Sequence, residues 1–107
     1  MTHTPEQAQQ LTRLRRAFRV TKPGLFRHEG AWVRSILERI HNLVRDTGIE
    51  VKYSGQLPIG FRAELIRIQG DLGSARTMRW KSGRMPQALV IAQEVVWGLE
   101  RLRKQMS

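Results

Sequence analysis

The stretch GDLGSARTMRWKSGR, residues 70–84, decides between three folds. It could form the turn and recognition helix of a helix-turn-helix protein, a β-hairpin arm with ARTMRWK as one strand, or the second half of one long helix that starts near Pro58. Apolar residues recur every three or four positions straight through both glycines, at Phe61, Leu65, Ile68, Leu72 and Ala75. This helical period predicts one helix over 58–81, in which the two glycines would be tolerable if another backbone packs closely against them.

Helices are also predicted on both sides of this segment. Residues 5–19 open with Thr4 as the N-cap, and Gln7 completes a capping box. Residues 29–47 carry the clearest apolar stripe of the chain, and Gly48 follows as a left-handed C-cap. Between these and the long helix, Ile49, Val51 and Tyr53 alternate with polar residues; a lone strand is unstable, so an extended linker is expected.

The last predicted helix covers residues 85–105, with Pro86 in its first turn. The expected fold class is therefore all-α: a small bundle of about four amphipathic helices in a single domain spanning residues 1–107. A length of 107 residues suits one compact domain. The absence of Cys excludes disulfides and thiolate metal sites. No apolar run is long enough to span a membrane, and MTHTPEQAQQ lacks a signal-peptide pattern, so a cytoplasmic protein is expected.

Charge is the strongest global signal. Nineteen Lys and Arg against nine Asp and Glu give a formal net charge of +10. The excess is uneven, since residues 1–30 and 58–84 each carry six basic and two acidic residues. Fifteen of the basic residues are Arg, which grips phosphate bidentately. These features indicate a nucleic-acid partner.

Two basic clusters are the candidate binding residues. The first follows RLRRAFR and comprises Arg13, Arg15, Arg16 and Arg19. The second cluster surrounds Trp80 and comprises Arg76, Arg79, Lys81 and Arg84. On a continuous helix, Trp80 would share a face with the residues four positions before and after it. We expect these side chains to contact phosphates while a base stacks on the indole. For the first cluster, the alternative is a charged rim around an apolar core stripe. For the second cluster, the alternative is that Trp80 is buried against a neighbouring helix or subunit.

Catalytic motifs are not evident. The three histidines, His3, His28 and His41, are scattered, and His41 is expected on the solvated face of its helix. The fragment IEVKY places Glu50 two residues before a lysine, as in many metal-dependent nucleases, but a second carboxylate on a neighbouring strand is lacking. We therefore expect a non-enzyme without a metal or cofactor.

Partner surfaces give two further alternatives. The segment MRWKSGRMPQALVIAQ resembles the end of a recognition helix in repressor-type DNA-binding regulators, although Arg67 stands where such a motif needs a small residue. Trp32 and Trp97 lie off or at the edge of their apolar stripes, which is typical of contacts between chains. An adaptor that binds an acidic protein instead of nucleic acid is the remaining class.

In length, predicted helical architecture, charge and lack of catalytic motifs, the chain resembles the small subunits of CRISPR effector ribonucleoproteins. This resemblance implies several copies stacked along larger protein subunits, with basic side chains near the guide–target duplex or the displaced strand. Carried over to this sequence, it implies phosphate contacts by the eight basic residues of the two clusters. The expected function is therefore non-catalytic binding of an RNA or DNA backbone within a multi-subunit ribonucleoprotein.

Overall fold

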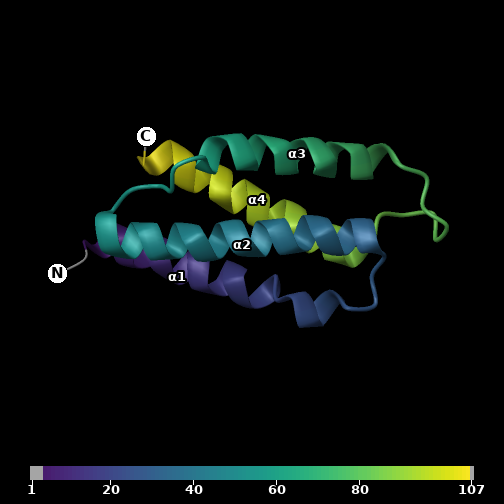
Figure 1. The fold of residues 1–107 in the computed structure, drawn as a ribbon, viewed down its shortest axis with the longest axis horizontal. Helices are drawn as coiled ribbons and strands as arrows, with labels where there is room; N and C mark the ends of the chain where they lie inside the picture. The colour runs from purple at the N-terminus through teal and green to yellow at the C-terminus, as the bar shows by residue number, and fades with distance from the viewer. Residues whose placement is uncertain (1–3, 107) are drawn as a thin grey trace.

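The computed structural model describes residues 4–106, which form four α-helices and one short 3₁₀ helix. These elements are α1 (Pro5–Val20), η1 (Pro23–Phe26), α2 (Ala31–Ser54), α3 (Phe61–Thr77) and α4 (Gln87–Met106). The all-α prediction is confirmed. Consecutive α-helices run in opposite directions, so both ends of the chain lie at one end of the bundle (Figure 1).

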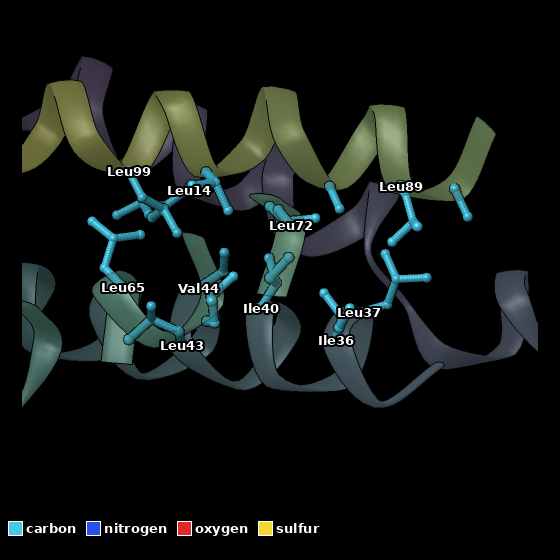
Figure 2. Close-up of a cluster of buried hydrophobic side chains, with 14 of the residues drawn as sticks. Leu14, Ile36, Leu37, Ile40, Leu43, Val44, Leu65, Leu72, Leu89 and Leu99 are labelled. Carbon is cyan, nitrogen blue, oxygen red and sulfur yellow. The ribbon is translucent and has the colours of Figure 1, made fainter. Parts of the chain in front are cut away.

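Helix α2 and helix α4 form the centre of the bundle. Each of them contacts the other and both remaining α-helices, while α1 and α3 lie on opposite sides of this pair (Figure 1). Figure 2 shows side chains from all four helices pointing into the same interior, among them Leu14, Ile40, Leu72, Leu89 and Leu99. The 21 buried apolar residues make up one hydrophobic core, which positions the helix ends and loops described below.

The predicted boundaries of α2 are wrong at its C-terminal end. The helix continues through Gly48 to Ser54, and Gly55 with φ 71° is the left-handed C-cap. The apolar stripe continues because Val51 is completely buried, whereas Ile49 and Tyr53 are exposed. The alternation of apolar and polar residues at 49–53 suggested an extended linker. In the structure these residues are helical, and only Val51 of the three apolar residues is buried.

The long helix is confirmed through both glycines but is shorter than predicted. It begins after Gly60, whose φ is 83°, and it ends at Thr77 because Met78 is extended. Residues 58–60 and 78–81 are therefore outside it. A Cβ on Gly70 would meet nothing within 4 Å, and one on Gly73 only the Arg76 guanidinium, so no other backbone packs closely there and the helix contains both glycines without that contact.

The helical state of residues 61–77 also removes two of the alternatives for the opening stretch. A helix-turn-helix motif would need a turn within residues 70–74, but these residues lie inside α3. The β-hairpin reading needs a strand in 75–81, and neither these residues nor any others in the described part of the chain form one.

Polar contacts fix α1 against α2, and two of them differ from expectation. The Thr4 side chain accepts a hydrogen bond from the Gln7 backbone N–H, as a cap should, but the Gln7 side chain donates to the Val51 carbonyl oxygen at 3.0 Å instead of completing a capping box. His41 is buried and not solvated. Its ring stacks on Phe18 with centroids 4.2 Å apart, and its Nδ1 lies 3.0 Å from the Thr21 hydroxyl.

Candidate nucleic-acid interface

The end of the bundle opposite the termini collects basic side chains from two distant segments. The 22–30 connection and the 78–86 loop both lie at this end, together with the first turn of α2 and the last turn of α3 (Figure 1). Residues 22–34 and 76–86 contain seven basic residues and one acid, Glu29. We call the exposed cations of this region the basic end: Lys22, Arg27, Arg34, Arg76, Arg79, Lys81 and Arg84.

Trp80 does not occupy the position predicted for it. It lies in the loop after α3, so it does not share a helix face with Arg76 and Arg84. Its indole Nε1–H donates a hydrogen bond to the Ala75 carbonyl oxygen at 3.0 Å, and its ring stacks on that of Trp32 with centroids 6.5 Å apart and planes at 25°. The tryptophan therefore anchors the loop to the start of α2.

The loop beyond Trp80 turns its charges outward. The Gly83 backbone N–H donates to the Trp80 carbonyl oxygen at 2.9 Å, and the φ of 82° at Gly83 favours glycine at this turn. The Ser82 hydroxyl donates to the Arg84 carbonyl oxygen at 3.1 Å. None of the seven basic-end cations forms an ion pair with another described residue. Their charge is thus available to a ligand.

The four arginines of α1 do not form one stripe. Arg13 and Arg16 line a groove between α1 and α4, whereas Arg15 lines a second groove between α1 and α2, beside Arg45 and Lys52. All four, including Arg19 near the basic end, are exposed and lack an ion-pair partner within residues 4–106. The first basic cluster predicted from the sequence is therefore spread over several sides of the helix.

Arginines elsewhere are held by carboxylates. Arg39 of α2 donates to Glu64 at 3.2 Å and also to Asp71, both on α3, and Arg67 donates to Glu64 at 2.9 Å. The hydrogen bond to Asp71 is the main cause that raises the pKa of Arg39, against burial. Burial would raise the pKa of Glu64, but hydrogen bonds from Arg67 and Arg39 outweigh it and lower that pKa. These charges stabilise the α2–α3 contact.

The predicted interface tryptophans separate. Trp32, 39% exposed, belongs to the basic end and is stacked on Trp80. Trp97 lies on α4 with 54% of its surface exposed and makes no ring contact within the described chain. Arg34 belongs to neither of the two basic clusters predicted from the sequence, although it lies at the basic end. Short connections between antiparallel helices were the available signal, because they bring the first and third loops to the same end.

The remaining chemistry is sparse. Within residues 4–106, His, Asp and Glu do not gather in any group of three that could hold a metal ion. The described helices include none with the length and apolar character to cross a membrane. Glu50 lies on α2 and accepts a hydrogen bond from the Ser54 hydroxyl at 3.2 Å. His3 lies outside the described residues.

Comparisons of the chain with protein-family models, curated proteins and solved structures found no match.

Proposed function

We propose that this protein is a non-catalytic subunit that binds the backbone of RNA or DNA through its basic end. The observation that carries the proposal is the set of seven exposed cations, without ion-pair partners in the described chain, around the stacked Trp32–Trp80 pair. Unpaired arginines attract phosphate at long range and grip it at short range. The half-exposed Trp32 ring adds a surface on which a base or sugar can stack.

Assembly with larger subunits is the finer part of the proposal. In this form the protein works in the cytoplasm, in several copies within a ribonucleoprotein such as a CRISPR effector complex. The support is the all-helical fold, the net charge of +10 and the exposed Trp97. A bundle of this kind can place its basic end on nucleic acid while another face contacts protein.

The test measures binding to labelled oligonucleotides of unrelated sequence, single-stranded and duplex, over a range of salt concentrations. We expect affinity to be nearly independent of sequence and to fall steeply with salt, because phosphate binding releases counterions. The triple variant Arg79→Ala, Lys81→Ala, Arg84→Ala should bind more weakly, with a slope of log affinity against log salt that is smaller by about 2 to 3.

The matched control removes the same charge elsewhere. Lys52 and Arg62 are exposed, form no ion pair within the described residues and lie outside the basic end, so their replacement by Ala should leave most of the affinity, whereas the double variant Arg79→Ala, Lys81→Ala should not. Equal losses in both variants would mean that net charge alone attracts the nucleic acid. Strong preference for one duplex sequence would identify a DNA-binding regulator, and no binding at low salt would refute the proposal in favour of an adaptor.

A further inference from the structure

Helices α1 and α4 leave an open groove between them, with a volume of about 530 Å³. Its floor is apolar and includes Leu14 and Ala17 of α1 and Leu99 and Leu102 of α4. Toward the basic end its lining includes Val20, which is 38% exposed. An apolar groove that remains open in the folded chain is a typical acceptor for an apolar partner surface.

The rim of this α1–α4 groove is mainly basic. Arg13 and Arg16 stand on the α1 side and Arg101 on the α4 side, and the acid among the lining residues is Glu94. All four side chains are exposed, and none forms an ion pair inside the described part of the chain. Three positive charges against one negative charge select a partner that carries acids beside its apolar residues.

Gly98 is the second unusual feature of the groove. It lies within α4, where glycine is a poor helix former, and its φ is not in the left-handed region. A Cβ at this position would meet no atom within 4 Å, so no neighbour in the folded chain requires the residue to be glycine. In the wall of a groove, a glycine permits close approach by the backbone of a bound partner.

We propose that the α1–α4 groove docks an acidic amphipathic helix of another protein. The lining residues of α1 extend from Gln10 to Val20, which corresponds to roughly 15 Å, or about three helical turns. A helix of that length would place apolar residues of one face on the floor and acids against Arg13, Arg16 and Arg101. The groove is distinct from the basic end, so this inference stands apart from nucleic-acid binding.

The probe is a synthetic helical peptide of about 14 residues with leucines along one face and glutamates beside them. Fluorescence anisotropy of the labelled peptide should show micromolar binding to the wild-type protein. A scrambled peptide of the same composition and a peptide with lysines in place of glutamates should each bind at least about tenfold more weakly.

Gly98→Leu tests the site directly, because the new side chain fills the groove without removing a core contact and improves helix propensity. Peptide affinity should fall at least about tenfold in this variant. The matched control is Gly70→Leu on α3, where a Cβ also meets nothing within 4 Å and peptide affinity should not change. Charge reversal by Arg13→Glu with Arg16→Glu should lower the affinity for the glutamate peptide and raise the affinity for the lysine peptide.

The proposal is wrong if the glutamate peptide fails to bind at about 1 mM, a concentration that detects even weak docking. It is also wrong if Gly98→Leu, folded by circular dichroism, binds as well as the wild type, or if the scrambled peptide binds equally. Loss of peptide binding in the Arg79, Lys81, Arg84 alanine variant would mean that the glutamates of the peptide bind at the basic end instead. Oligonucleotide binding should persist in Gly98→Leu, so the two proposals fail independently.

Discussion

Helices α1 and α3 flank the same central pair, yet they use their charges in opposite ways. On α3, Glu64 and Asp71 both accept hydrogen bonds from Arg39 of α2, so charge helps to hold that helix in place. On α1, four arginines form no ion pair within residues 4–106. Like charges on one helix repel each other, and arginines without a carboxylate partner are available to other molecules.

Helix α1 is attached by two buried apolar side chains, Leu11 and Leu14, and by further contacts near its two ends. The Gln7 side chain donates to the Val51 carbonyl oxygen at 3.0 Å near one end, and the ring of His41 stacks on Phe18 near the other. Toward α4, the Gln10 side-chain amide donates to the Gln105 Oε1 at 3.4 Å, and the groove described above lies open between the two helices. The comparison therefore predicts that mutations on α3 affect stability, whereas mutations on the open side of α1 affect binding.

The largest expected difference comes from truncating apolar side chains on the two helices. Leu72 of α3 is 1% exposed, so Leu72→Ala should lower the free energy of unfolding by about 3 kcal/mol through lost burial and the cavity it leaves. Val20→Ala on α1 should cost under about 0.5 kcal/mol, since Val20 is 38% exposed. Urea unfolding followed by circular dichroism measures both, and equal costs would show that Val20 is packed and that this side of α1 is not open.

An intermediate effect is expected from pH, through His41 at the α1–α2 contact. Burial, followed by the charges of Arg45 and Lys22, lowers the pKa of His41 below its ordinary value of 6.5. The unfolded chain then binds a proton at His41 more readily than the folded chain. The contribution of neutral His41 to the free energy of unfolding is therefore complete above pH 6.5 and decreases as the pH falls through and below 6.5. The decrease cannot exceed about 1.4 kcal/mol per pH unit.

The control for this pH effect is His41→Phe, which keeps a ring against Phe18 and removes the titrating group. Urea unfolding between pH 7 and pH 5 should show a smaller dependence on pH in the variant than in the wild type. If the two slopes agree, His41 does not set the pH response, and the α1 attachment does not depend on its neutral form.

Periodicity predicted much of the fold because it depends on each helix alone. The stripe from Phe61 to Ala75 identified α3 across two glycines, and the helix of residues 5–19 differs by one residue from the observed α1. The end of α2 was mispredicted because Gly48 has the residue type of a C-cap, while the burial of Val51 that continues the helix depends on tertiary packing.

The candidate site was harder to predict than the helices because it is made by two loops. The sequence indicated which cations were in excess, but Trp80 was placed on a helix that ends three residues earlier. Its pairing with Trp32 joins residues that are distant in sequence, and no local pattern reports that contact. The burial of His41 was missed for the same reason, since Phe18 and Thr21 reach it from another helix and its cap.

The smallest expected effects separate paired from unpaired arginines. Arg39→Gln should lower the free energy of unfolding by about 1 kcal/mol, because Glu64 and Asp71 lose a partly buried partner. Arg19→Gln removes the same charge from α1 and should change stability by under about 0.5 kcal/mol. The cost of Arg39→Gln should shrink as the pH falls below 4.5, where protonation of Glu64 weakens the pair. If both variants cost the same at neutral pH, the α1 arginines have partners within the fold, and the argument that they are available for ligands fails with them.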